Sequence, residues 1–190
     1  MKANLKTPIL TVLAAAISCA LPLAAGANDQ GGTDTRFSSD FSPIVEKVRD
    51  VVLGFSKEEL KKYGAVLRTP CVTGPEFGAM GVHLINAENV DGILDVYKPE
   101  ALIYEPQANG KLRIVGVEYI VPKDAWDALH PNPLDRPSLE GHLLNFVGSP
   151  NRYGLDGFYE IHVWAFEDNR KGALTDWNPD VTCEKQRLPR

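Results

Sequence analysis

Three of the four histidines lie in segments whose composition predicts β-strands, and they are the residues of this sequence best suited to chemistry. Imidazole nitrogens combined with one carboxylate are a ligand set that zinc and copper commonly take in proteins. His83, His142 and His162 would supply the imidazoles, and Glu118 lies in an otherwise apolar strand. We therefore expect a site for zinc or copper built from His83, Glu118, His142 and His162.

The segment Phe158–Phe166 is the most strand-like part of the chain, because aromatic and β-branched residues dominate it. It contains Glu160 and His162, which are two positions apart and so leave the same face of a strand. Glu160 and Glu105 are the substitutes for Glu118 as the carboxylate ligand. The fourth histidine, His130, lies in a proline-rich loop.

Two other interpretations of these residues stay open. A histidine on an apolar strand is more often hydrogen-bonded in a core or cleft than a metal ligand, and Glu118 could pair with an arginine (Arg113, Arg136 or Arg152). Alternatively, the protein is an enzyme or a small-molecule receptor without metal, in which His162 and Glu118 act as acid, base or orienting groups. That interpretation predicts a deep cleft lined by Ile103, Ile114, Ile120 and Trp164.

Several classes of function are disfavoured by what the sequence lacks. It has no H-E-x-x-H, no G-x-S-x-G, no phosphate-cradling glycine loop and no dinucleotide fingerprint. The formal net charge is −5, without any basic run, which argues against nucleic acid and anionic membranes as partners. A metal ion or a small molecule is the partner that remains, and the sequence decides neither catalytic turnover nor oligomeric state.

The first 27 residues have the pattern of a secretory signal peptide. Lys2 and Lys6 precede an apolar run, and Ala25–Ala27 gives a small-x-small cleavage site. A lipid-attachment role for Cys19 is the weaker alternative. Residues 28–39 are polar and glycine-rich and predict a disordered leader, followed by one domain over 40–190. No later segment has the length of a membrane span, so we expect a periplasmic or secreted protein with a net charge of −7 after loss of the two lysines.

Two cysteines remain after cleavage, Cys71 and Cys183. In an exported chain, two cysteines near opposite ends of the ordered region predict one disulfide. Two free thiols, one of them a metal ligand, are the alternative.

The predicted secondary structure begins with helix and continues with strands. Apolar residues at helical spacing predict a helical segment over Ser42–Tyr63, with a capping box at Ser56 and Glu59. Strands are expected at 80–85, 101–106, 111–121 and 158–166, with a weaker candidate at 141–147. This pattern favours an α+β fold: a single bent antiparallel sheet of four to five strands with the N-terminal helical segment packed on one face.

Asn109-Gly110 between two apolar runs predicts a β-hairpin. A loop of two or four residues would place odd positions of the first strand opposite even positions of the second. Glu118 would then share a face with Ile103, Ile114 and Gly116. Both faces are largely apolar, so we expect the sheet to be covered on both sides or to curl.

Several blocks of the sequence resemble those of an uncharacterised family of exported bacterial proteins. The similar words cover most of the chain from Cys71 onward and are Gly78–His83, Tyr104–Pro106 with Leu112–Tyr119, Arg152–Leu155, Tyr159–Ala165 and Asp176–Cys183. The resemblance implies export and a shared fold, and it brings no established activity.

Overall fold

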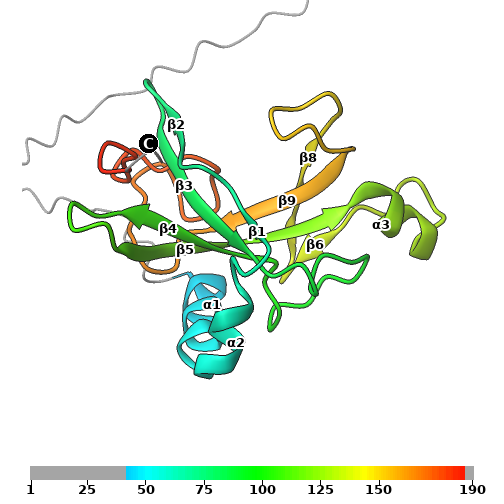
Figure 1. The fold of residues 1–190 in the computed structure, drawn as a ribbon. Coiled ribbons are helices and arrows are strands. Elements are labelled where there is room, and N and C mark those ends of the chain that lie inside the picture. The colour runs from blue at the N-terminus through cyan, green and yellow to red at the C-terminus, as the bar shows by residue number, and fades with distance from the viewer. Residues whose placement is uncertain (1–41, 187–190) are drawn as a thin grey trace, which may run out of the picture. The chain divides into compact units, whose positions relative to one another are not determined.

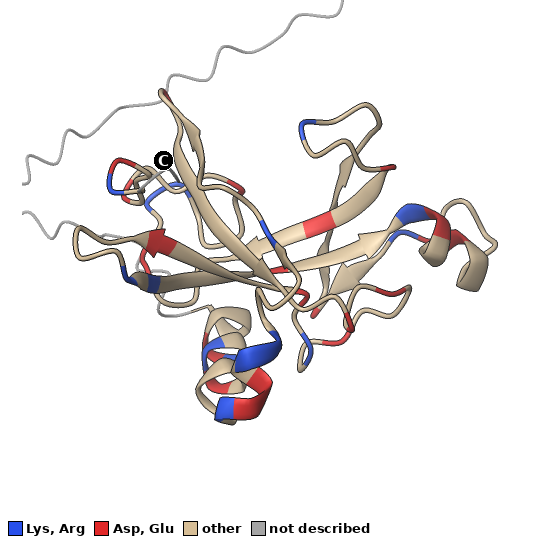
Figure 2. Cartoon of the chain, viewed as in Figure 1, with Lys and Arg blue, Asp and Glu red and all other residues tan. Residues whose placement is uncertain are grey.

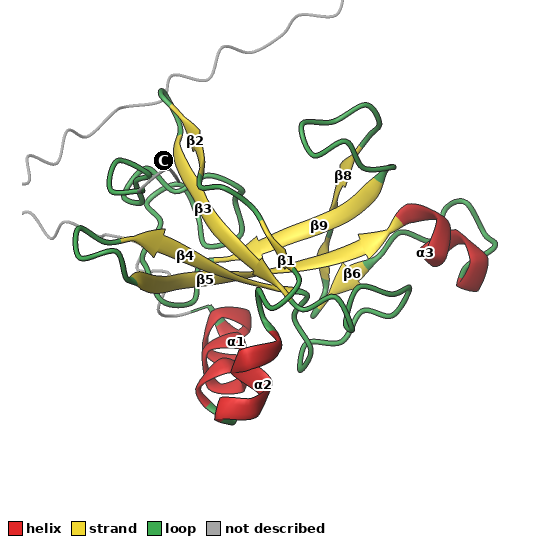
Figure 3. Ribbon diagram, viewed as in Figure 1, coloured by secondary structure: helices red, strands yellow, loops and turns green. Residues whose placement is uncertain are grey.

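The computed structural model of the protein describes residues 42–186, which form an α+β fold around one antiparallel sheet (Figures 1 and 3). The predicted signal peptide (1–27), the predicted leader (28–39) and Cys19 lie outside the described residues. The strands of the main sheet are β1 (Leu67–Arg68), β2 (Val72–Gly74), β3 (Gly78–Ile85), β4 (Ala101–Pro106), β5 (Leu112–Pro122), β8 (Asn145–Val147) and β9 (Phe158–Val163).

The order across this sheet is β1-β3-β4-β5-β9-β8, and β2 also pairs with β3, at the end of β3 away from β1. The predicted number of four to five strands is therefore wrong, because the sheet has seven. The additional strands β1 and β2 are two and three residues long, too short to leave an alternating pattern in the sequence. A separate two-stranded sheet pairs β6 (Ser138–Leu139) with β7 (His142–Leu143).

The predicted helical segment is divided into α1 (Pro43–Leu53) and α2 (Lys57–Lys62), and a third helix, α3 (Lys123–Leu129), follows β5. The helix α1 buries an apolar stripe against the sheet. The capping box is present, since the Ser56 side chain accepts from the Glu59 N–H and the Glu59 carboxylate accepts from the Ser56 N–H. The helix α2 has no buried residue, so only α1 packs as expected.

Each face of the sheet is covered by different parts of the chain. One face, called here the helix face, packs against α1 and carries Leu102, Val117 and Tyr119. The opposite face carries Ile103, Val115 and Trp164 and packs against Val181 from the C-terminal segment. We call it the site face. Charged residues concentrate on the helices and loops, while the strands carry few (Figure 2).

The hairpin between β4 and β5 differs from the prediction in one respect. Gln107 and Lys111 are joined by a backbone hydrogen bond of 2.8 Å, so the loop has three residues, with Gly110 at φ +78°. Positions of equal parity then pair near the turn, as Tyr104 does with Ile114. The facing predicted for Ile114 is therefore wrong. Val115 has no partner on β4 and forms a β-bulge. Beyond it, starting with the pair Ile103–Gly116, odd positions of β4 again lie opposite even positions of β5, as predicted.

The sheet curls toward its site face. His83 on β3 and His162 on β9 are three strand spacings apart, which is about 14 Å in a flat sheet. Their ring nitrogens nevertheless lie 3.1 Å apart. Gly116 lies between them on β5, where a Cβ atom would come within 2.7 Å of the Val163 carbonyl oxygen. The glycine and the neighbouring bulge therefore allow the strands to close over this face.

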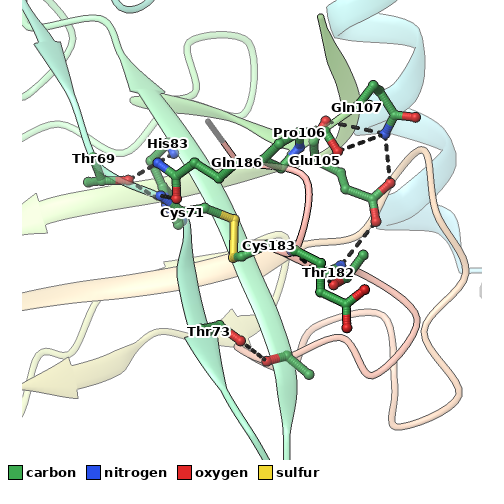
Figure 4. Close-up of a disulfide and its surroundings, with 12 residues drawn as sticks. Thr69, Cys71, Thr73, His83, Glu105, Pro106, Gln107, Thr182, Cys183 and Gln186 are labelled. Atoms are coloured by element: carbon green, nitrogen blue, oxygen red, sulfur yellow. Dashed lines mark hydrogen bonds between the residues drawn. A yellow bond between two sulfur atoms is a disulfide. The ribbon is translucent and has the colours of Figure 1, made fainter. Parts of the chain in front are cut away.

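The predicted disulfide between Cys71 and Cys183 is present (Figure 4). It joins the segment before β2 to the C-terminal segment, and the Cys71 N–H donates to the Gln186 Oε1 at 3.1 Å. A disulfide is compatible with an oxidising compartment. Within residues 42–186, none of the helices has the length and apolar character to cross a bilayer.

Removal of the disulfide should destabilise the fold. The bond joins residues 112 positions apart, and the loop-entropy relation gives about 5 kcal/mol for a loop of that size. We expect the Cys71→Ala/Cys183→Ala variant to lose that much free energy of unfolding in urea titrations, and reduced wild-type protein to behave alike. Equal stability of oxidised and reduced wild type would contradict a structural role for this bond.

Glu100 should make stability depend on pH. Burial raises its pKa from its usual value of 4.5 to about 9, although it accepts a 2.8 Å hydrogen bond from the Ile120 N–H. The folded protein therefore binds this proton more tightly than the unfolded chain, and stability falls as pH rises from about 4.5 toward 9. At pH 8, Glu100→Gln should raise the free energy of unfolding by more than about 1 kcal/mol.

The control for this effect is Glu58→Gln, because the Glu58 side chain is 80% exposed and pairs only at the surface with Lys61. Denaturant titrations of both variants between pH 5 and 9 give the comparison. If the difference between Glu100→Gln and wild type does not grow with pH, Glu100 is already ionised in the folded protein.

Candidate metal centre

Three of the four predicted metal ligands converge on the site face. His83 comes from β3, Glu118 from β5 and His162 from β9, and all three are buried. The Nε2 atoms of the two histidines lie 3.1 Å apart. An Oε2 atom of Glu118 lies 3.4 Å from the His83 Nε2. One donor atom from each residue lies within 4.8 Å of the other two, so a single ion could contact all of them.

Strand pairing explains how these side chains meet. Glu118 is directly opposite His162 in the β5–β9 register. His83 is opposite Ile103 on β4, and Ile103 is opposite Gly116 on β5. All of these residues point to the site face, and Gly116 places no side chain between the two histidines. The curl of the sheet then brings His83 across to His162.

Each histidine has a polar partner on its second ring nitrogen. The Nδ1 of His162 lies 2.9 Å from the Glu160 Oε2, and the spacing of two along β9 places them on one face as predicted. The Nδ1 of His83 lies 3.3 Å from the Thr69 Oγ1, and the same oxygen accepts from the His83 backbone N–H at 3.0 Å. These contacts orient both rings with Nε2 toward the centre, the arrangement found in metal sites with second-sphere partners.

The two rings divide their protons unequally. Burial lowers the pKa of His83, and the positive charge of His162 lowers it further. Burial also acts to lower the pKa of His162, but the charge of Glu118 and the hydrogen bond to Glu160 outweigh it, so the pKa of His162 is raised. A protonated His162 therefore donates its Nε2–H to a neutral His83. Burial raises the pKa of Glu118, partly offset by the charge of His162.

The distances suit a tetrahedral metal ion. Zinc binds imidazole nitrogen at 2.0–2.1 Å, so two ligand atoms on a tetrahedron lie about 3.3–3.4 Å apart. The 3.1 Å between the imidazole nitrogens and the 3.4 Å between Glu118 and His83 come close to that spacing without any rearrangement of the strands. A cation between the nitrogens would replace the proton that they now share.

A second acidic group borders the first. Glu160, His162 and Asp176 also place one donor atom each within 4.8 Å of one another. Asp176 accepts from the Asn145 side chain at 3.1 Å, and burial raises its pKa. Neither Asp176 nor Thr69 is predicted at the site from the sequence, because both lie in loops whose positions no periodic pattern indicates.

A cavity of about 480 Å³ opens above His83 and Glu118. A smaller cavity of about 140 Å³ reaches Glu118 from the side of Glu160 and Asp176. Arg152 and Tyr153, from the loop before β9, line both. The smaller cavity is also lined by Met80, whose sulfur accepts a weak 3.9 Å contact from the Tyr153 hydroxyl. Strand alternation predicts Met80 on the opposite face, but it is the extra residue of a bulge between β2 and β3.

The other predicted ligands lie elsewhere. His142 is exposed on β7, in the separate two-stranded sheet, and does not belong to the group of donor atoms at the site. Glu105 instead accepts from Arg113 at 2.9 Å and from the Thr182 backbone N–H at 3.0 Å. His130 stacks on Trp126 and pairs with Asp135 in its loop. The prediction that all four residues share one site is therefore wrong for His142.

Both structural alternatives are found in part, since His83 and His162 are buried and hydrogen-bonded, as the first expects. Among the described ion pairs, Glu118 pairs with no arginine, since Arg113 binds Glu105 and Glu167. Ile103 and Trp164 are fully buried in the core of the site face. Of the predicted cleft residues, Ile120 lines the cavity. The cleft exists, but most of its walls come from residues 67–72, which include β1 and the start of β2, and from the loop before β9.

Comparison of the chain with family models, with curated proteins and with solved structures gave no match. We therefore infer the function of the protein from the geometry of this site.

Replacement of Glu160 tests the charge balance of the site. Because the charge and hydrogen bond of Glu160 raise the pKa of His162, Glu160→Gln should lower that pKa by about one pH unit or more. NMR titration of the imidazole signals of metal-free protein measures it. Glu88→Gln is the matched control, because Glu88 is exposed and pairs with Lys62. An unchanged pKa of His162 in Glu160→Gln would contradict the described contact.

Proposed function

We propose that this protein is an exported metal-binding protein that holds zinc or copper through His83, Glu118 and His162. The observation that carries the proposal is the convergence of two imidazole nitrogens and one carboxylate oxygen from three different strands, at 3.1 and 3.4 Å. Two Nε2 lone pairs cannot face each other at this distance without a hydrogen or a metal ion between them. An N–H hydrogen of one ring can fill that position in the metal-free protein, and a metal ion could replace it.

The surroundings of the ligands support the same proposal. Glu160 and Thr69 orient the two imidazoles through Nδ1, so that neither ring must turn when an ion binds. Burial excludes water and strengthens the attraction between the ion and Glu118. A metal ion would also neutralise a carboxylate that burial otherwise penalises.

The side of the site that faces the cavity determines whether a bound ion could take a fourth ligand. Three protein ligands with a fourth position facing a cavity are typical of zinc sites that bind a further ligand. The cavity above His83 and Glu118 supplies that position. The sulfur of Met80 borders the smaller cavity, and thioether sulfur favours copper(I) over zinc.

Export is the second part of the proposal. The predicted signal peptide, the resemblance to exported bacterial proteins and the disulfide between Cys71 and Cys183 agree with a periplasmic or secreted location. The metal would therefore be taken up outside the reducing cytoplasm.

The second candidate is an enzyme or small-molecule receptor without metal, favoured by the volume of the cavity. At about 480 Å³ it lies within the range of ordinary ligand pockets, and His83 and Glu118 lie at its floor. A protonated His162 next to a neutral His83 could then act in acid–base chemistry.

Metal analysis of protein purified without a histidine tag tests the proposal. We expect about one zinc or copper ion per chain after equilibration with the metal and removal of the excess, measured by elemental mass spectrometry. His83→Ala and His162→Ala should each lose the ion, because two remaining ligands hold it weakly. His142→Ala is the matched control and should retain it, since His142 lies outside the site.

Folding of each variant is checked by circular dichroism, and binding of the metal to wild type by its effect on thermal unfolding. Wild-type protein without stoichiometric metal would end the proposal and leave the second candidate. Equal metal content in His142→Ala and His162→Ala would show that the ion binds elsewhere.

A further inference from the structure

The cavity above the metal centre has apolar walls and a basic rim. Most of its lining side chains are hydrophobic, and they come from the segment that runs from β1 to β3, from β5, from the loop before β9 and from the start of β9. The walls are formed by Leu67, Pro70, Val72, Ile85, Ile120, Leu155 and Phe158. Two arginines, Arg68 and Arg152, complete the rim, and Tyr153 adds a hydroxyl. Such a cavity combines a surface for a hydrocarbon body with positions for an anionic group.

The two arginines have no carboxylate partner among the described ion pairs, although the chain as a whole has a net charge of −5. By comparison, Arg113 and Arg170 are both paired with acidic residues. The Arg152 guanidinium lies over the Trp177 ring, 5.4 Å from its centroid, which orients the group without neutralising it. Two unneutralised cations at one cavity of an acidic protein point to an anionic ligand.

We propose that this cavity binds a small organic anion with an apolar body, such as a medium-chain carboxylate, its charged group held by Arg68 and Arg152 and its hydrocarbon part against the apolar walls. The inference rests on the proposed function, because the positive charge beside His83 and Glu118 would come from the bound metal ion. With a divalent ion on two neutral histidines and Glu118, the ion and these three ligands carry one net positive charge, next to the Glu160 carboxylate that contacts the second nitrogen of His162. The carboxylate of the ligand could then also take the open position on the metal.

The size and polarity of the cavity select this class of ligand. A cavity of about 480 Å³ lies within the range of small-molecule pockets and is more than large enough for an eight-carbon acid. An amine would meet two arginines and is disfavoured by repulsion. A small hydrophilic anion such as acetate would leave the apolar walls in contact with water, and each missing methylene costs about 0.8 kcal/mol.

Calorimetric titration of the zinc-loaded and the metal-free protein with octanoate tests the inference. We expect saturable one-to-one binding of octanoate, with octylamine, octan-1-ol and acetate at least tenfold weaker. Arg68→Gln and Arg152→Gln should each weaken octanoate binding on the order of tenfold, through loss of a charged hydrogen bond. Leu155→Asn should also weaken it, and because Leu155 is 55% exposed this change leaves the core intact.

Arg170→Gln is the matched control, since Arg170 is exposed and pairs with Asp180 outside the cavity. It should bind octanoate as wild type does. Both rim variants should keep their zinc content, because neither arginine belongs to the metal group. Octanol or octylamine binding as tightly as octanoate would overturn the inference, as would unchanged affinity in the rim variants.

The failure of this inference is distinguishable from the failure of the proposed function. Zinc bound without octanoate binding overturns the ligand class and leaves the metal centre intact. Octanoate bound with the expected rim dependence, but without any stoichiometric metal, supports the ligand class and removes the metal. Absence of both signals overturns both proposals.

Discussion

The contact between the two imidazole nitrogens of His83 and His162 is the constraint around which the site face is arranged. At 3.1 Å, in a buried environment, it requires a hydrogen between the two nitrogens, and the raised pKa of His162 places a positive charge on that ring. Burial of a charge is costly unless it is paired and hydrogen-bonded. Glu118 and Glu160 supply the negative charge, and Thr69 completes the hydrogen bonding of the second ring. The same arrangement that satisfies a proton here presents three donor atoms to a metal ion.

The rest of the sheet makes that contact possible by bending. Gly116 and the bulge at Val115 let β9 close over β5. The bend is stabilised from the opposite side, where α1 and the apolar residues of β4, β5 and β9 form the larger core. This separation of roles is physically reasonable, since the helix face supplies the hydrophobic stabilisation that the polar side chains on the site face do not.

The disulfide connects the stability of the fold with the geometry of the site. Cys71 lies two residues after Thr69, which contacts His83 (Figure 4), and three residues after Arg68, which lines the cavity. Its bond to Cys183 holds this short segment against the C-terminal part of the chain. The strands β1 and β2 are only two and three residues long, so their own hydrogen bonds give little support. A covalent link is therefore a physical means of keeping the cavity wall and Thr69 in position.

The sequence by itself determined the local features of this protein. It predicted the strands near β3, β4, β5 and β9, the hairpin at Asn109-Gly110, the pairing of Cys71 with Cys183 and the shared face of Glu160 and His162. The strands and the shared face depend on the alternation of side chains along a strand, and the hairpin depends on the residues of its turn. The disulfide depends on the number of cysteines and on export to an oxidising compartment. All of these can be read from neighbouring residues or from composition. It also singled out His83, Glu118 and His162 by their types.

Only the tertiary structure decided which of those residues meet. His83 and His162 are 79 positions apart on strands that are not neighbours, and their contact depends on the curl of the sheet. His142 was excluded because its segment pairs in a separate small sheet. The facing of Ile114 and Met80 depended on a three-residue loop and on bulges, each of which shifts strand parity by one position. Such single-residue shifts leave the hydrophobic pattern almost unchanged, and so the sequence could not reveal them.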